Sequence, residues 1–248
     1  MTGVCLQVIN SGRDVPDIDI LLRYYPIVKF LKSFYKPDTK ILEVGSFNAG
    51  IATFFPVPVT ALDIRFADDI DDKLVTKVVS SVENIPFEEK TFDVVISIDM
   101  FEHLSKGIRN LALGEFFRVA KPHGKIVIAV PCGELSSIHE NLLNVIYRLF
   151  RNREHPWLKE HIAYGLPDWK ELYKQIKSVN GNCRIQVLNN INVFVWFWLY
   201  IFKSILPVSM REILVQMVFP IIRNVNIVPY RKIFIIYPHP SLSPLGRG

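Results

Sequence analysis

A short apolar segment that ends in a glycine turn, ILEVGSFNAG at residues 41–50, constrains the fold of this chain more than any other feature. Ile41 to Val44 predict a buried strand, residues 45–48 a turn, and residues 49–55 the start of a helix. A strand, a glycine turn and a helix N-terminus together place backbone N–H groups where they can meet a polar ligand closely. We therefore expect a parallel α/β sheet with a ligand site where this strand ends.

Further apolar runs, each bounded by turn residues, predict the other strands of the sheet. With the first segment at 40–45, they lie at 58–63, 75–80, 92–98, 125–130, 183–188 and 230–237. Helical periodicity predicts helices within 17–35, across 108–119 up to a stop at KPHG, and after Pro167. This order predicts a Rossmann-like, doubly wound α/β fold with a mostly parallel seven-stranded sheet and helices on both faces.

The chain is expected to form a single domain over residues 1–237. Its core would cover 38–189, an apolar helical insertion 190–228 and the last strand 230–237, whereas the tail 238–248, rich in Pro, Gly and Ser, is predicted to be disordered. Within the insertion, Lys203 interrupts the run NVFVWFWLYIFKSIL before it reaches the roughly 18–20 residues of a membrane-spanning helix. A capping box from Ser209 to Glu212 predicts an amphipathic helix in its second half.

Residues that are missing from the glycine turn disfavour two classes of ligand. A dinucleotide site wants a second glycine where this chain has Phe47, and a P-loop wants a lysine and a hydroxyl that are both missing. Two acidic residues remain, Glu43 in the first strand and Asp63 at the end of the second. A carboxylate at a strand end can accept hydrogen bonds from both hydroxyls of a ribose, and the other acid suits a cationic amino acid end. The alternative is that both are ordinary solvated acids.

Four segments in order resemble the motif series of class I S-adenosylmethionine (SAM)-dependent methyltransferases, the type 11 group in particular: ILEVGSFNAGIA, VTALDIR, SSVENIPFEEKTFDVVISIDMFEHL and EFFRVAKPHGKIVIAVP. The resemblance covers residues 38–131. It implies an enzyme that binds SAM as its cofactor and transfers a methyl group. The cofactor-binding residues that it implies are Glu43, Gly45 and Ser46 at the methionine end, Asp63 and Ile64 at the ribose, Ser81 and Val82 at the adenine, and Asp99 beside the methionine end and the substrate.

Three positions differ from the pattern of the family that the segments resemble. Phe47 and Ala49 stand where glycine is common, and Ser81 stands where an Asp commonly reaches the adenine amino group. These differences keep open a function of another class, a noncatalytic binding or scaffold protein with the same fold. A nucleotide-dependent oxidoreductase on a similar sheet is disfavoured by the missing second glycine.

The candidate catalytic residues follow the fourth predicted strand, in the segment ISIDMFEHL. Open α/β sheets place ligand contacts at the carboxyl ends of their strands, which makes Asp99, Glu102 and His103 the candidates. SAM brings the electrophile, so the protein has to position the substrates, exclude water and, for some acceptors, remove a proton. His103 is the preferred base because the unperturbed pKa of histidine lies near neutrality. A structural or helix-capping histidine is the alternative.

The variable region after the fifth strand contains His139, Glu160, His161 and Tyr164, where the family usually builds its substrate lid. Their spacing matches no metal-site motif, so no metal is expected. Glu160 and His161 are expected to close over the acceptor. The three cysteines show no CxxC spacing and predict buried thiols.

The net charge of +5 lies entirely in residues 191–248, since the first 190 residues hold 23 basic and 23 acidic side chains. The predicted catalytic part therefore has no basic footprint for nucleic acid, and a small-molecule or lipid-like acceptor is expected. The apolar segment 190–228 has three interpretations: helices packed on the sheet or on a second copy in a homodimer, contact with a membrane surface, or a tunnel for a lipid-like acceptor. The start MTGVCLQVIN lacks a secretory signal, which predicts a cytoplasmic protein, peripheral at the inner face of a membrane in the second interpretation.

Overall fold

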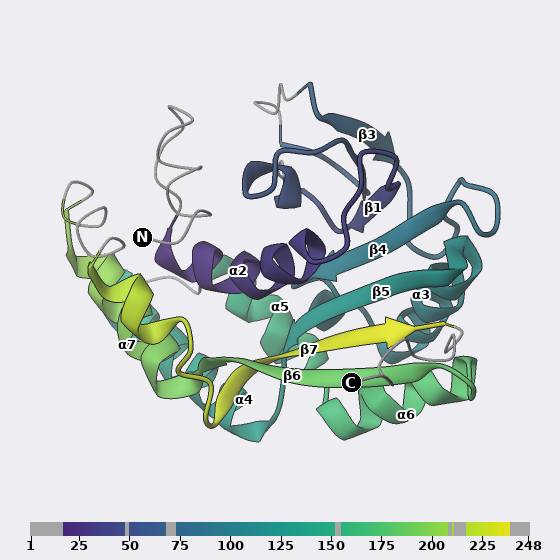
Figure 1. Ribbon diagram of the computed structural model, residues 1–248. Helices are drawn as coiled ribbons and strands as arrows, with labels where there is room; N and C mark the ends of the chain where they lie inside the picture. Colours follow the sequence, from purple (N-terminus) through teal and green to yellow (C-terminus); the bar gives the residue numbers. More distant parts are fainter. Residues whose placement is uncertain are drawn as a thin grey trace, which may run out of the picture.

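The computed structural model describes residues 17–47, 50–67, 73–151, 155–207, 210 and 217–238. Within them the chain forms a seven-stranded sheet of order β3-β2-β1-β4-β5-β7-β6 (Figure 1). The strands are β1 (Ile41–Val44), β2 (Val59–Asp63), β3 (Val75–Val79), β4 (Phe92–Ile98), β5 (Ala120–Pro131), β6 (Arg184–Asn192) and β7 (Pro229–Tyr237). The predicted doubly wound, mostly parallel sheet is confirmed.

The direction of the strands changes at one side of the sheet. The neighbours from β3 to β5 run parallel, and β7 pairs antiparallel with both β5 and β6. From β1 the chain passes to β2 and β3 on one side, then to β4 and β5 on the other. The carboxyl ends of β1 and β4 therefore flank the switch point at which open α/β sheets bind their ligands.

Helices cover both faces of the sheet, as predicted. They are α2 (Ile18–Lys32), α3 (Lys106–Val119), α4 (Glu134–Arg151), α5 (Pro156–Tyr164), α6 (Trp169–Val179) and α7 (Val193–Ile205), with single 3₁₀ turns η1 (Gly50–Thr53) and η2 (Phe101–His103). Side chains alternate between the faces along a strand. In β4, Val94 and Ile96 accordingly pack in the core with α2 and α7, whereas Val95 packs in the second core with α3 and α6.

The structure corrects the prediction of a helix at residues 49–55. Only the four-residue 3₁₀ turn η1 forms there. Pro56 and Pro58 follow it closely, and proline lacks the N–H that would continue a helix. The helix N-terminus expected beside the glycine turn is therefore a single short turn.

Other boundaries also differ from the prediction. Neither α4 nor α5 was expected, β6 continues to Asn192, and β5 begins at Ala120, with a shift of register between Phe92 and Val94 of its partner β4. Helix α3 ends at Val119, just before KPHG, as predicted, and the KPHG segment itself belongs to the irregular start of β5. Ser209 and Glu212, the ends of the predicted capping box, and the tail beyond residue 238 lie outside the described residues.

The apolar insertion packs one side of α7 on the sheet. Its inner side chains include Val193, Trp196 and Phe197, which are buried, and Trp196 stacks on Tyr230 of β7 with 3.9 Å between ring centroids. This agrees with the first of the three interpretations for that side of the helix. Among the described residues, no helix has the length and apolar character needed to span a membrane.

Candidate active site

Glu43 is buried at the end of β1 and faces into the protein. One carboxylate oxygen accepts a hydrogen bond from the N–H of Ile51 in η1 at 2.7 Å and lies 3.4 Å from the hydroxyl of Ser46, while the other accepts from the hydroxyl of Tyr24 at 3.4 Å. Burial raises the pKa of Glu43 to about 7. The backbone N–H that was expected to meet a ligand is thus bonded to Glu43.

The glycines of the turn are required by its backbone and its packing. Gly45 has a φ of +83°, and a Cβ there would lie 2.6 Å from the side chain of Met100, which follows β4. Gly50 has a φ of +57°, and a Cβ there would lie 2.1 Å from the carboxylate of Glu43. The first strand end is therefore packed directly against the segment that contains the candidate catalytic residues.

Phe47, which replaces a family glycine, is held by the loop after β2. Its carbonyl accepts a hydrogen bond from the N–H of Ala67 at 3.0 Å, and its ring lies 5.5 Å from the guanidinium of Arg65. The turn thus accommodates the aromatic side chain against a neighbouring loop. Asn48 and Ala49 lie outside the described residues.

Asp63 and the predicted adenine-binding residues lie at the ends of neighbouring strands. Asp63 closes β2, is half-buried, and accepts a hydrogen bond from the N–H of Arg65 at 3.2 Å; burial raises its pKa. After β3, the hydroxyl of Ser81 donates to Glu83 at 3.1 Å, and Val82 is buried. Ile64 is 71% exposed, whereas Asp63 and Ser81 are partly buried and Val82 is buried.

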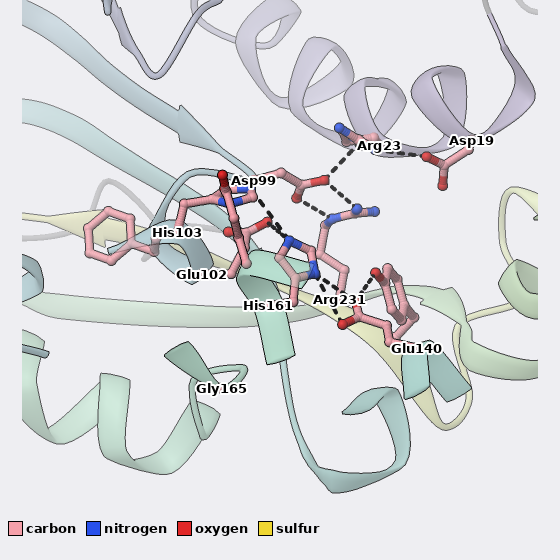
Figure 2. Close-up of polar contacts among 12 residues, drawn as sticks. Asp19, Arg23, Asp99, Glu102, His103, Glu140, His161, Gly165 and Arg231 are labelled. Atoms are coloured by element: carbon pink, nitrogen blue, oxygen red, sulfur yellow. Dashed lines mark hydrogen bonds and ion pairs between the residues drawn. The ribbon is translucent and has the colours of Figure 1, made fainter. Parts of the chain in front are cut away.

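Asp99, predicted as both a catalytic and a cofactor-binding residue, is held between two arginines (Figure 2). Arg231 of β7 donates to its two oxygens from Nε at 2.7 Å and from Nη2 at 2.6 Å, and Nε of Arg23 in α2 forms an ion pair with it at 3.0 Å. Arg231 is 1% exposed, and its charge is paired there. This geometry favours a positioning role for Asp99 over the predicted catalytic one.

Glu102 and His103 occupy η2, directly after β4. Glu102 is fully buried, and burial together with the charge of Asp99 raises its pKa to about 8. His103 Nδ1 lies 2.7 Å from a carboxylate oxygen of Glu160 in α5. Burial and the charge of His161 lower the pKa of His103, which favours its neutral form.

His161 brings α5 and α4 to the same cluster. Its Nε2 lies 3.4 Å from Nε2 of His103, and its Nδ1 lies 3.1 Å from both carboxylate oxygens of Glu140 in α4. Burial opposes the charged form of His161, but the hydrogen bond and the charge of Glu140 raise its pKa overall. Tyr230 of β7 donates its hydroxyl proton to Glu140 at 2.5 Å. Figure 2 shows His161 between Glu102 and Glu140.

Arg109 connects the two segments that carry the histidines, η2 and the end of α5. This buried residue of α3 donates from Nε to the carbonyl of Phe101 at 2.8 Å and from Nη2 to the carbonyl of Gly165 at 3.3 Å. The first carbonyl belongs to η2, and the second follows α5. The positions of His103 and His161 are thus fixed relative to one another.

The structure brings together only part of the predicted lid set. Glu160 and His161 lie beside His103, and their expected closure over an acceptor stays a prediction. His139 instead packs its ring against Phe194 and Phe197 of α7, and Tyr164 is 54% exposed.

Sequence reasoning missed several residues of the site: Arg23, Tyr24, Arg109, Glu140 and Arg231. For Glu140 a signal was present, because Ser136, Glu140, Leu143 and Asn144 recur at helical spacing, and all four are buried. The arginines lie in other elements, and no local pattern marks them.

Comparisons with known proteins agree with the topology. A family model described as a methyltransferase domain matches residues 42–128. The chain is 30% identical over 176 residues to the ubiquinone/menaquinone biosynthesis C-methyltransferase UbiE of Paraburkholderia xenovorans, covering 63% of this chain and 68% of that protein. It is 28% identical over 127 residues to the glycine/sarcosine/dimethylglycine N-methyltransferase of Actinopolyspora halophila, covering 46% of this chain but only 22% of the relative's length.

A solved structure supports the fold alone. The geranyl diphosphate C-methyltransferase of Streptomyces coelicolor, in complex with Mg²⁺, geranyl diphosphate and S-adenosylhomocysteine, superposes with a TM-score of 0.54. The alignment covers 86% of this chain and 76% of that chain at 12% sequence identity.

Proposed function

Because this chain belongs to the class I SAM-dependent methyltransferases, we propose that it transfers the methyl group of SAM to a small-molecule or lipid-like acceptor. Bound SAM supplies an electrophilic methyl group on a sulfonium. The observation that carries the proposal is the contact of Gly45 with Met100, which packs the glycine turn of β1 against the segment leading into η2. A cofactor at the turn and an acceptor at η2 would be neighbours.

The residues at the strand ends suit the parts of SAM. The half-buried carboxylate of Asp63 suits the two ribose hydroxyls, with the exposed Ile64 beside it. Val82 offers an apolar surface to the adenine, next to Ser81. Gly45 lets the main chain approach the methionine end closely. Glu43 and Ser46 would hold the backbone of the glycine turn in position rather than contact SAM, since Glu43 accepts the hydrogen bond from the N–H of Ile51 and lies beside the hydroxyl of Ser46.

The acceptor is proposed to lie beside Glu102, His103 and His161. These side chains come from η2 and α5, and Arg109 holds both elements in place. Positioning an acceptor against a bound electrophile is the main task of such a site. Where the acceptor must lose a proton, this cluster is the group of titratable side chains that would handle it.

An apolar surface supports a lipid-like acceptor. One face of α4 exposes Ile138, Leu142, Val145 and Leu149 at helical spacing, and the outer side of α7 exposes Phe194, Trp198 and Phe202. The exposed Arg148 of α4 adds positive charge to the same helix. Apolar side chains with basic neighbours are typical of helices that lie in the surface of an anionic membrane. We propose that this face contacts such a surface, where a lipid-like acceptor would be found.

The noncatalytic alternative is not favoured, since the matched relatives carry the names of methyltransferases. Phe47 is the residue that suggested it, and this side chain is accommodated by Arg65 and Ala67. The expected cytoplasmic location stays a prediction.

Calorimetric titration with SAM and S-adenosylhomocysteine tests the cofactor part. The wild-type chain is expected to bind both, and Asp63→Ala to bind SAM with an affinity lower by roughly 10- to 150-fold, since hydrogen bonds to a charged group contribute about 1.5–3 kcal/mol. Ser81→Ala serves as the matched control, with a small loss. Wild-type protein that gives no heat with either compound would restore the scaffold alternative.

Turnover of paired acceptors tests the acceptor part. Phenolic acceptors with and without an isoprenoid tail would be compared, with transfer of labelled methyl from SAM as the readout. A higher kcat/KM for the tailed member of each pair is expected. Equal values for both members would argue for a small polar acceptor instead.

A further inference from the structure

His103 and His161 face each other with their Nε2 atoms. Nδ1 of His103 faces Glu160 at 2.7 Å, and Nδ1 of His161 faces Glu140 at 3.1 Å. Ionised carboxylates accept hydrogen bonds and do not donate them, so the proton of each neutral ring lies on Nδ1. Each Nε2 then keeps its lone pair, and the two Nε2 atoms lie 3.4 Å apart. When both rings are neutral, two lone pairs face each other at this distance, and either a proton on His161 or a metal ion between the rings satisfies both.

Glu102 supplies a third group at the same place. It is fully buried, and neither of its carboxylate oxygens has a hydrogen-bond partner within the described part of the chain. One of these oxygens lies 4.0 Å from Nε2 of His161. An unpaired carboxylate is costly to bury unless a cation or a donor meets it. Asp99, three residues earlier, already has its two arginines.

We propose that Glu102, His103 and His161 bind one divalent transition-metal ion, for which Zn²⁺ is the best fit. One ligand atom from each residue lies within 4.8 Å of the others. Metal–nitrogen bonds of about 2.05 Å in a tetrahedral site bring two ligand nitrogens to about 3.3 Å from each other, close to the 3.4 Å between the histidines. Two imidazoles with one carboxylate favour zinc over magnesium, which prefers oxygen ligands.

The surroundings of the three side chains are those of a built metal site. Histidine ligands of metals usually donate their other ring N–H to a carboxylate, which fixes the tautomer and the ring orientation. Glu160 and Glu140 stand in these positions, and Glu140 is itself held by the hydroxyl of Tyr230. No spacing in the sequence reveals this site, because its ligands come from η2 and α5 and its supporting carboxylates from α4 and α5.

The metal would change the role assigned to His103. As a ligand through Nε2, His103 orients a metal ion and is no longer the base predicted from the sequence. Three protein ligands leave at least one coordination position for another molecule. That this position takes an oxygen of the acceptor rests on the proposed function, whereas the binding of the metal does not.

Metal binding by the full chain tests the proposal directly. Protein freed of metal by dialysis against a chelator would be titrated with ZnCl₂ by calorimetry and with CoCl₂ by visible absorption. One equivalent of either metal per chain is expected, with the absorption bands of four- or five-coordinate cobalt. Glu102→Gln and His161→Ala should each weaken binding by about 100-fold or more, and Glu140→Gln by about 10- to 100-fold. His123→Ala, at an exposed histidine in β5, is the matched control and should bind as wild type.

Absence of metal binding, or binding that does not depend on the proposed ligands, would overturn the proposal. If the metal-free chain takes up neither Zn²⁺ nor Co²⁺, or if Glu102→Gln and His161→Ala bind as tightly as His123→Ala, a proton shared by the two histidines occupies the position and the proposal fails. Circular dichroism of each variant, with the near-isosteric Glu102→Gln as the reference, separates loss of a ligand from loss of the fold. SAM titration of the metal-free chain separates failure of this proposal from failure of the proposed function.

Discussion

At the scale of single residues, Glu43 and Asp63, the two acids that were predicted to bind the cofactor, have different environments. Glu43 is buried beneath the turn and bonded to the N–H of Ile51, whereas Asp63 is half-buried at a strand end. The sequence places both at the carboxyl edge of the sheet, which is right, but it does not show which of them faces the interior. That depends on η1, in which the N–H of Ile51 donates to the carboxylate of Glu43.

The buried state of Glu43 predicts a pH-dependent stability. Its pKa is raised to about 7 in the folded chain, so the protonated form stabilises the fold at low pH and this contribution is lost as the pH rises through about 7. Glu43→Gln keeps the acceptor for Ile51 without the charge. The variant should match wild type near pH 4.5 and exceed its unfolding free energy by up to about 3 kcal/mol at pH 8.

Urea unfolding of the cofactor-free proteins at a series of pH values measures this difference. Besides Ser46 and the backbone N–H of Ile51, the titratable group that faces Glu43 is Tyr24 of α2. Glu88→Gln, at an exposed residue, is the control and should follow the wild-type profile. A profile for Glu43→Gln that runs parallel to wild type at every pH would contradict the prediction.

At the scale of elements, strands were the most predictable part of the fold. Segments such as ILEV and FDVVISI are apolar runs of strand length because these strands are buried on both faces. Helix α4 was missed although its apolar residues, among them Ile138 and Leu149, recur at helical spacing, and these residues lie on its exposed side. The site was predictable where it lay in one segment, as for Glu102 and His103. The arginines that hold Asp99 lie 76 and 132 positions away, beyond the reach of local patterns.

Asp99, which follows β4, is paired with Arg23 of α2 and Arg231 of β7. We therefore expect that replacing Arg231 strongly lowers the stability of the fold. Replacing one partner of a buried ion pair costs about 3–5 kcal/mol where the remaining charge has no other partner. Asp99 keeps Arg23, so a cost near the lower end, about 3 kcal/mol, is expected here. Arg231→Met should lower the unfolding free energy by this amount, and Arg231→Met with Asp99→Asn should recover part of it. Lys232→Met, at the next position of β7, removes the hydrogen bond to the exposed Asn189 and the contact with the ring of Trp169, and should cost about 1 kcal/mol or less.

Urea unfolding with m-values compares these variants. Equal destabilisation by Arg231→Met and Lys232→Met would mean that the buried pair contributes nothing particular to the fold. A double variant less stable than Arg231→Met alone would show that Asp99 is held by Arg23 without help from Arg231.

At the scale of the whole molecule, apolar side chains gather outside the sheet on one side. Helices α4 and α7 cover the same face of the sheet as α2 (Figure 1). Both leave apolar side chains exposed on their outer sides. Exposed apolar patches of this kind are rare in monomeric proteins and mark contact surfaces. The opposite face, covered by α3 and α6, offers a reference within the same chain.

Flotation with vesicles tests this surface as a membrane contact. The wild-type chain is expected to float with vesicles that contain anionic lipid at low salt, and less so at high salt, where charge attraction is screened. Trp198→Glu and Phe202→Glu should each reduce the floating fraction severalfold. Leu111→Glu makes the same change at a side chain of α3 that is 55% exposed on the other face, and it should float as wild type. Wild-type protein that stays at the bottom of the gradient at low salt would remove the membrane proposal.

The place of β7 in the sheet fixes the order in which the molecule can be completed during translation. This strand lies between β5 and β6 although both precede it in the sequence. A nascent chain that has not yet released residues 229–237 from the ribosome therefore leaves an edge of β5 unpaired and β6 without its partner strand. It also lacks Arg231 for Asp99 and Tyr230 for Glu140. The strand that completes the sheet and the side chains that complete the candidate active site thus lie in the same segment. A chain whose synthesis stalls before residue 229 lacks both.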